Sequence, residues 1–385
     1  MRVLLWSNSP WTLTGYGKQT KAIAGLLQDL GHEVAILGLS GLLCASLDWG
    51  GITVYPAHEH PLGADVIGYY ANHFAADVVL SLYDVWAFPA DTRQCLPCPW
   101  IALIPVDGAP VSERMLRRIQ TVDYPVAFSL FGKHELWKAG IEADYIPLGI
   151  DCQVFVPGDK AAARAQLGIP PGVFLVTMVA ANKGFPARKS WPEALAAFAG
   201  FHRRHPDSFL YLHTTKKPYG SEGRGIYFDA LIEALDIPPS AVTFADQGEL
   251  AIGIPDEQMA TIYQASDVLL SPSMGEGFGL PIAEAQACGC SVITQNCSAM
   301  SELTCNGIAV EPLQPMWIPP LGYWWQQASI ENIETGLDVI CELSQRQRKD
   351  MARAGIKFVR EHYNWPVVVG QHWRPFLEQA EAGLW

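Results

Sequence analysis

Positive charge is scarce in this chain. Among its 385 residues, 26 lysines and arginines stand against 39 aspartates and glutamates, which gives a net charge of −13 at pH 7. A large basic surface for nucleic acid is therefore not expected, although a local basic groove is compatible with this composition. Hydrophobic residues make up 49% of the chain and there is no low-complexity tract. The chain is long enough to bury the cores of two domains of ordinary size.

Long apolar runs are also missing. No segment reaches about 18 continuous apolar residues, the length that a membrane-spanning helix requires. The N-terminal run MRVLLWSNSPW is too short for a signal peptide and alternates like a first strand. We expect a cytoplasmic protein without strong signs of membrane or nucleic-acid binding.

The cysteines form neither a disulfide framework nor a zinc site. Nine is an odd number, scattered over a long chain, which fits free thiols in a reducing compartment. Cys95 and Cys98 form a CxxC pair, but zinc would need two further ligands and no second pair has zinc-finger spacing. A redox role stays open, and two thiols without a function are the simpler interpretation.

A dinucleotide fingerprint is missing as well. The first 37 residues predict a βαβ unit, the opening of a doubly wound parallel sheet, with a strand over 2–7, a loop over 8–17, a helix over 18–30 and a strand over 32–37. The loop contains Gly15 and Gly17 but no third glycine at the spacing of an NAD site. Later strands end in Asp84 and Asp107, and ligands of such sheets bind at the carboxyl ends of strands.

The most informative stretch runs from Asp267 to Glu302. It predicts a strand over 268–270, a loop GEGFG over 275–279, a helix over 282–287 and a strand over 291–294. Glycine at 277 and 279 allows close approach of the backbone to a ligand. Backbone N–H groups near Phe278, Gly279 and Leu280 would point at a ligand over the helix N-terminus, which favours a phosphate.

Two carboxylates flank this loop. Glu276 lies before it and Glu284 follows eight residues later, inside the helix. Carboxylates on a rim accept hydrogen bonds from the hydroxyls of a ribose or a sugar. An anion-binding loop between two such acids suits a nucleotide-sugar; the alternative is a tight strand-to-helix turn with two solvated acids.

The segment EGFGLPIAE resembles the E-x7-E signature of retaining GT-B glycosyltransferases, in particular family 4 (glycosyl transferases group 1). The similarity includes Asp267, Pro272-Ser273, Ala287-Cys288-Gly289 and Ser301-Glu302. It is good over about residues 145–365 and patchy over 1–150. The resemblance implies an α/β GT-B fold, with two Rossmann-like doubly wound domains facing a central cleft. The domains would be 1–152, with a C-terminal helix at about 366–385 packing back on it, and 153–365.

The resemblance also implies an activity and its residues. A hexosyl group would pass from a nucleotide-sugar donor to an unknown hydroxyl acceptor with retention, without a cofactor or a metal. Catalytic roles fall to Glu276 and Asp107. Asp107 follows Val106, where many members have a His-Asp pair, so the acceptor-side histidine is unassigned. Asp107 could take part in the acceptor-side role, or it could merely cap the following turn. Donor-binding roles fall to Gly15, Gly17, Asn182, Arg188, Lys189, Gly277, Phe278, Gly279, Leu280 and Glu284.

Other interpretations remain for several of these features. Asn182-Lys183 replaces the family's earlier arginine, and the basic turn at Arg188-Lys189 could be merely solvated. The segment 316–325, MWIPPLGYWW, could be a loop over the acceptor or a packing surface. The whole protein could instead be a GT-B-shaped epimerase or hydrolase of the nucleotide-sugar, or a non-catalytic ligand-binding protein. The donor base, its sugar and the acceptor are open.

Overall fold

The computed structural model describes residues 1–42, 44–218 and 225–383. The chain divides into two compact units. Unit 1 comprises Met1–Gly149, Ile318–Tyr323 and Pro366–Trp385, and unit 2 comprises Ile150–Trp317 and Trp324–Trp365. The predicted C-terminal helix at 366–385 falls in unit 1, and its last two residues lie outside the described ones.

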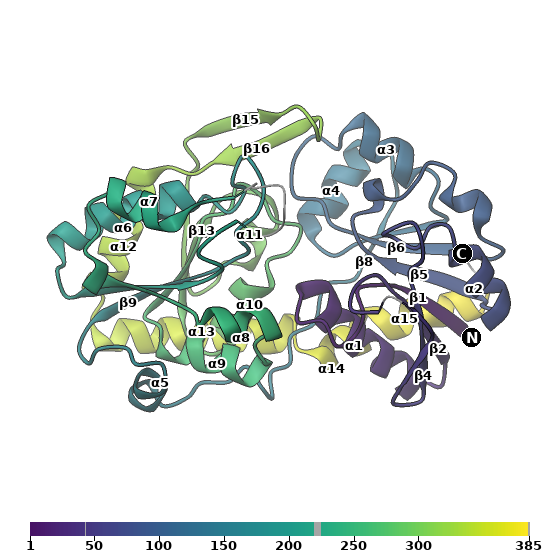
Figure 1. Ribbon diagram of the computed structural model, residues 1–385, viewed down its shortest axis with the longest axis horizontal. Helices are drawn as coiled ribbons and strands as arrows, with labels where there is room; N and C mark the ends of the chain where they lie inside the picture. Colours follow the sequence, from purple (N-terminus) through teal and green to yellow (C-terminus); the bar gives the residue numbers. More distant parts are fainter. Residues whose placement is uncertain (43, 219–224, 384–385) are drawn as a thin grey trace. The chain divides into compact units, whose positions relative to one another are not determined.

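Unit 1 is built on an eight-stranded sheet with the order β3-β4-β2-β1-β5-β6-β7-β8 (Figure 1). Its strands are β1 (Arg2–Ser7), β2 (Glu33–Gly38), β3 (Leu47–Trp49), β4 (Ile52–Pro56), β5 (Val78–Leu82), β6 (Trp100–Ile104), β7 (Tyr124–Ala127) and β8 (Asp144–Tyr145). All neighbours are parallel except β3 and β4. Because β1 pairs with β2 on one side and β5 on the other, the winding direction reverses at β1.

Helices cover this sheet, and apolar strand side chains fill the space beneath them. The helices are α1 (Gly15–Asp29), α2 (Ile67–Phe74), α3 (Glu113–Ile119), α4 (Leu130–Lys138), α14 (Trp365–Val368) and α15 (Arg374–Glu381), with short turns η1 (Val85–Ala87), η2 (Thr92–Cys95) and η4 (Val369–Trp373). Trp6 and Trp100 are fully buried in the core. Their indole N–H groups donate to the Leu62 carbonyl and the Ser81 hydroxyl, so these tryptophans are structural.

Unit 2 is built on a six-stranded, fully parallel sheet with the order β11-β10-β9-β12-β13-β14. Its strands are β9 (Phe174–Val179), β10 (Ser208–His213), β11 (Val242–Phe244), β12 (Val268–Ser271), β13 (Ser291–Gln295) and β14 (Gly307–Val310). The winding reverses between β9 and β12. In a doubly wound sheet, the loops that leave the carboxyl ends of two such strands diverge and leave room for a ligand.

Helices lie on both faces of the unit 2 sheet (Figure 1). One face is covered by α6 (Trp191–Arg204), α7 (Phe228–Ala234) and α12 (Ile330–Glu342), which share a core with β9, β10, β12 and β13. On the other side α9 (Asp256–Ala265), α10 (Leu280–Ala287) and α13 (Gln345–His362) pack together. The remaining elements are α5 (Lys160–Gln166), η3 (Pro239–Ala241), α8 (Gln247–Ile252) and α11 (Ser298–Leu303). Both units are thus Rossmann-like.

A separate hairpin interrupts this order between β14 and α12. The strands β15 (Gln314–Ile318) and β16 (Tyr323–Gln327) pair only with each other. The sequence analysis left segment 316–325 as a loop or a packing surface. The structure shows a ribbon in which Trp317 and Trp324 are exposed beside the buried Ile318, Tyr323 and Trp325, and its turn, residues 318–323, belongs to unit 1 by its contacts.

The described residues also bear on the cysteines and on membranes. Each of the nine cysteines is free. Among the described helices, none is both long and apolar enough to cross a bilayer. Within the same residues, no group of three or more His, Cys, Asp or Glu side chains is arranged to hold a metal ion.

Candidate functional site

The loops that follow β9 and β12 bring two cations and a carboxylate together. Arg188 and Lys189 come from the first loop and Glu276 from the second. The Lys189 ammonium donates to Glu276 Oε1, and Arg188 Nη1 lies 3.1 Å from Glu276 Oε2. Arg188 also donates to the Gly275 carbonyl. The reversal of winding at β9 and β12 explains this meeting of residues almost ninety positions apart, because both loops leave adjacent strands at the same edge.

Backbone contacts hold the two loops in place. The Met274 N–H donates to the Arg188 carbonyl at 2.7 Å, which joins the loops directly. The Glu276 N–H donates to Ser298 Oγ at 2.9 Å, and the Ala299 N–H donates to the Glu276 carbonyl at 3.3 Å. Glu276 is therefore fixed from the start of α11 as well as from its own loop.

Glu276 is a buried, fully ionised carboxylate. We expected a carboxylate on the rim of the loop, with a solvated acid as the alternative, and the residue is only 8% exposed. Burial by itself raises the pKa of Glu276, and the nearby charges of Arg188 and Lys189 outweigh burial and lower this pKa to about 2. Two cations against one carboxylate leave a net positive charge at this edge of the sheet, which favours an anionic ligand. The alternative of a merely solvated basic turn is wrong, because Arg188 and Lys189 are both half-buried.

The glycine-rich loop ends at the N-cap of α10. Gly279 is the N-cap residue, with φ of +108°, a region that L side chains rarely adopt. A Cβ there would also lie 2.9 Å from Ile282 Cδ1. Leu280 begins the helix, and Pro281 occupies its first turn without an N–H to satisfy. The backbone thus reaches the helix N-terminus in a conformation that requires glycine.

Two other loop residues, Gly277 and Phe278, are buried. The ring of Phe278 packs edge-on against Tyr363, with centroids 5.5 Å apart. Its side chain therefore anchors the loop to the core, and only its backbone is available for the predicted contact with a donor.

Glu284 also lies in the interior rather than on a rim. It is in the second turn of α10, is buried, and accepts a hydrogen bond of 2.7 Å from the Tyr263 hydroxyl on α9. Burial first, and then the charge of Glu284, raise the pKa of Tyr263 well above its ordinary value, so this tyrosine stays a proton donor. The alternative of two solvated acids beside the loop is wrong, because both carboxylates are buried and each contacts a side chain of another element.

The Asn182 side chain joins the loop after β9 to the segments that follow β10. Its amide nitrogen donates to the carbonyls of Thr215 and Ile226, and its amide oxygen accepts from the Ile226 N–H at 2.7 Å. The side chain thus holds the start of the β9 loop against the segments that follow β10. Sequence offered no signal for this role beyond the amide itself, which can donate and accept at once.

In unit 1, Gly15 and Gly17 lie in the first turn of α1 rather than in the predicted loop. Thr14 is the N-cap, and its hydroxyl accepts from the Gly17 N–H at 3.1 Å. The sequence analysis assigned residues 8–17 to a loop and began the helix at residue 18, although glycine generally disfavours helix interiors. The N-cap hydrogen bond outweighs this preference in the first turn.

Glycine is required at 17 by packing, and this predicts an asymmetric response to alanine. A Cβ on Gly17 would lie 2.2 Å from the Thr12 carbonyl oxygen, whereas a Cβ on Gly25 in the same helix would meet nothing within 4 Å. Gly17→Ala should lower the free energy of unfolding by about 1–3 kcal/mol through overpacking. Gly25→Ala should be neutral or stabilise by roughly 0.5–1 kcal/mol. Chemical denaturation of both variants measures this, and equal stabilities would contradict it.

Asp107 belongs to a set of tyrosine–carboxylate contacts at the carboxyl ends of strands in unit 1. It follows β6, and its Oδ1 accepts from the Tyr323 hydroxyl at 2.7 Å. Asp84, which follows β5, accepts from the Tyr16 hydroxyl at 3.1 Å. Burial and then Asp84 raise the pKa of Tyr16 well above its usual value. The sequence analysis named both aspartates but missed Tyr323, which lies more than two hundred residues from Asp107.

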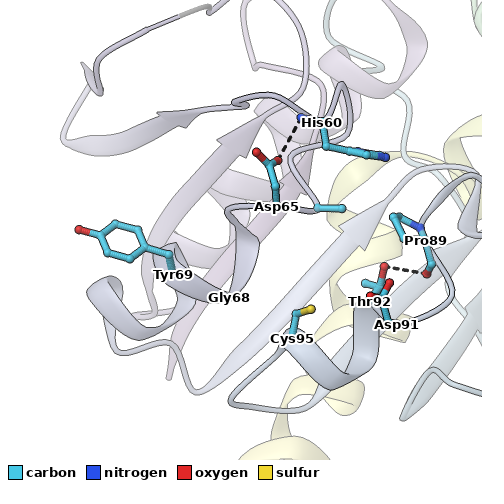
Figure 2. Close-up of a pocket in the computed structure, with 9 residues that line it drawn as sticks. His60, Asp65, Gly68, Tyr69, Pro89, Asp91, Thr92 and Cys95 are labelled. Carbon is cyan, nitrogen blue, oxygen red and sulfur yellow. Dashed lines mark hydrogen bonds between the residues drawn. The ribbon is translucent and has the colours of Figure 1, made fainter.

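A cavity of about 540 Å³ also lies in unit 1, and neither of these aspartates lines it. Its lining includes His60, Asp65, Tyr69, Asp91 and Cys95 (Figure 2). The Asp65 carboxylate accepts from the His60 backbone N–H. None of the predicted site residues lines this cavity, so it is not the candidate site.

The CxxC pair has one thiol at that cavity and one in the core. Cys95 is exposed, whereas Cys98 is buried. Burial raises the pKa of Cys98 to about 11. At neutral pH its thiolate, the reactive form, is scarcely populated.

Comparison with known proteins gives the following similarities. Residues 243–358 match the family model of glycosyl transferases group 1. The D-inositol 3-phosphate glycosyltransferase of Segniliparus rotundus is 35% identical over 150 residues, which cover 39% of this chain. That match spans only 31% of the curated relative's own length.

Solved structures match over almost the full chain. Sucrose-phosphate synthase from Thermosynechococcus elongatus has a TM-score of 0.80 at 19% identity and covers 99% of this chain and 100% of its own. Anabaena HepE, solved in complex with UDP and glucose, has a TM-score of 0.71 at 16% identity and covers 98% and 100%. Residues 243–358 thus carry the sequence pattern of glycosyl transferases group 1, and the chain as a whole has the α/β fold of the GT-B glycosyltransferases.

Proposed function

We propose that this protein is a retaining glycosyltransferase that moves a hexosyl group from a nucleotide-sugar to a hydroxyl acceptor. The observation that carries the proposal is the cluster of Arg188, Lys189 and Glu276 beside the N-terminus of α10. This cluster combines surplus positive charge with a carboxylate that can bind hydroxyls. The segment that matches glycosyl transferases group 1 contains Glu276 and α10.

In this proposal the cations act on the leaving diphosphate. When the bond from the anomeric carbon to the phosphate oxygen breaks, the electron pair and negative charge go to the diphosphate. Arg188 and Lys189, with the backbone N–H groups near Phe278, Gly279 and Leu280, would stabilise that charge. Because side chains supply the charge, we propose that no metal is needed. Unchanged turnover after treatment with EDTA supports this, and loss of turnover that Mg²⁺ or Mn²⁺ restores contradicts it.

The remaining residues would orient the two substrates. Glu276 would bind hydroxyls of the transferred sugar, and Glu284 would bind those of the ribose. The acceptor oxygen forms its new bond on the face that the diphosphate leaves, and its proton passes to the departing phosphate oxygen. Asp107 would orient the acceptor hydroxyl. Asn182 would support the donor through the loop that it holds, and Gly15 and Gly17 through the first turn of α1.

The first test is thermal stability against UDP, GDP, ADP, TDP, CMP and NAD. A ligand at about 100 times its dissociation constant adds roughly 2.7 kcal/mol to the free energy of unfolding, which is a visible shift. We expect a shift with one diphosphate, and UDP is the first candidate because Anabaena HepE was solved with UDP. No shift with any diphosphate, or a shift with NAD alone, would require withdrawal of the proposal.

Product analysis then separates transfer from its alternatives. Incubation with the nucleotide-sugar that matches the preferred diphosphate, with and without an acceptor panel, should give a new glycoside only when an acceptor is present. The alternative of an epimerase or hydrolase would be indicated if the main product were an altered or hydrolysed sugar. The rate of its formation would then not depend on the acceptor. Binding without turnover of any donor would indicate a ligand-binding protein.

A further inference from the structure

The hairpin β15–β16 presents two tryptophans on its open face. Trp317 and Trp324 are 44% and 41% exposed, and their rings meet edge to face with centroids 5.2 Å apart. Of the residues next to them in sequence, Ile318, Tyr323 and Trp325 are buried and Met316 is partly buried. This alternation is that of a ribbon packed on one face and open on the other. We refer to the exposed rings of Trp317 and Trp324 as the tryptophan platform.

The hairpin carries no charge. The segment from Gln314 to Gln327, QPMWIPPLGYWWQQ, contains no Asp, Glu, Lys, Arg or His, in a chain with a net charge of −13. Such a surface offers no ion pair to a phosphate, whereas nucleic-acid binding depends on lysines and arginines. Attraction to an anionic bilayer depends on them too. The platform therefore complements an uncharged occupant.

Hydrogen bonds join the base of the hairpin to residues close to the candidate site. At the base of the hairpin, the Gln326 N–H donates to the Met274 carbonyl at 2.9 Å, and Gln295 Nε2 donates to the Gln326 carbonyl at 3.1 Å. Met274 lies two residues before Glu276. A surface fixed before binding loses little conformational entropy when a ligand arrives.

We propose that the tryptophan platform binds a neutral oligosaccharide as the acceptor. A pyranose ring has hydroxyls at its edge and C–H groups on its faces, so it can stack on an indole without any charged contact. This inference rests on the proposed function and names the chemical class of its acceptor. The edge-to-face geometry offers the ring surfaces at different angles, which suits successive sugar residues rather than one flat ring system.

The test follows the indole N–H signals of the full-length protein by NMR, with UDP present, during titration with maltohexaose, cellohexaose and mannohexaose. Signals of Trp317 and Trp324, assigned from the variants that lack them, should shift with at least one of these sugars. Trp317→Ala and Trp324→Ala should each weaken binding roughly 5- to 10-fold, as expected for loss of one aromatic contact. Trp137→Ala is the matched control, because Trp137 is 66% exposed on α4 in unit 1 and stacks on His134.

Three outcomes would overturn the inference. The first is that none of the neutral hexasaccharides shifts these signals. The second is that the affinity for the sugar is unchanged in the double variant Trp317→Ala/Trp324→Ala. The third is that phosphatidylcholine vesicles, rather than sugars, bind through the platform. Retention of the UDP-induced thermal shift in the double variant shows that it is folded and that the donor site is intact. If nucleotides bind and no sugar does, this inference alone fails. If no diphosphate binds, the proposed function fails, whether or not the platform binds sugar.

Discussion

Glu276→Gln is expected to lower turnover by about 10²–10³-fold, the usual loss when one preorganised polar group of a site is removed. The amide has the same size but cannot neutralise Arg188 and Lys189 or accept hydrogen bonds at both of its atoms. Nucleotide binding should survive, because the cations that would hold the diphosphate remain. Steady-state kinetics and the nucleotide-induced thermal shift measure the two effects separately. Turnover equal to that of the wild type would remove Glu276 from the proposed mechanism.

The same variant should be less stable in the absence of nucleotide. Removal of one partner from a fully buried ion pair costs roughly 3–5 kcal/mol. The Arg188 and Lys189 side chains are 26% and 22% exposed, so we expect a smaller loss, about 2–3 kcal/mol. A diphosphate would compensate the unpaired cations, so its thermal shift should be larger in the variant than in the wild type. Glu257→Gln is the control, because Glu257 is an exposed carboxylate in the same unit.

The stability difference between wild type and Glu276→Gln should depend on pH. In the folded protein the pKa of Glu276 is lowered from 4.5 to about 2. A lowered pKa means that the carboxylate stabilises the fold above about pH 4.5 and loses this contribution as the pH falls toward 2. The two proteins should therefore differ most near neutral pH and converge in acid. A difference that stays constant from pH 7 to pH 3 would show that the ion pairs do not contribute.

Lys189→Ala is expected to abolish the diphosphate-induced thermal shift and to lower turnover by roughly 10²–10³-fold, because the leaving charge loses a fixed cation. Arg188 remains beside Glu276, so the carboxylate keeps one partner and the fold is retained. In Lys189→Arg a guanidinium takes the place of the lysine ammonium. This variant should therefore recover part of the nucleotide-induced thermal shift that Lys189→Ala loses. Both shifts are measured with the diphosphate that the wild type prefers.

Lys183→Ala is the matched control for Lys189→Ala. Lys183 is in the same loop after β9 but is exposed. If charge anywhere in the loop were sufficient, both alanine variants would lose the nucleotide shift equally. If only Lys183→Ala lost it, the assignment of Lys189 to the diphosphate would be wrong.

Several features followed from the sequence because neighbouring residues decide them. Apolar runs predicted the strands over 2–7 and 268–270, which the structure contains as β1 and β12. The order of glycines and proline around Gly279 predicted a loop that enters a helix, since a positive φ and a missing N–H are properties of single residues. The predicted α/β class with parallel sheets was also confirmed. It could be predicted because it depends on the alternation of strands and helices along the chain.

Other features depended on tertiary structure alone. Sequence analysis placed Glu276 and Glu284 on a rim and did not predict that both are buried, because the burial of a carboxylate depends on partners distant in the chain. Strand order decided that Arg188 and Lys189 meet Glu276, and packing paired Glu284 with Tyr263. The same holds for Tyr323 and Asp107. The sequence by itself determined the local backbone and the residue types of the candidate site, whereas the pairing of its charges was decided by which strands lie side by side, since no local pattern encodes that order.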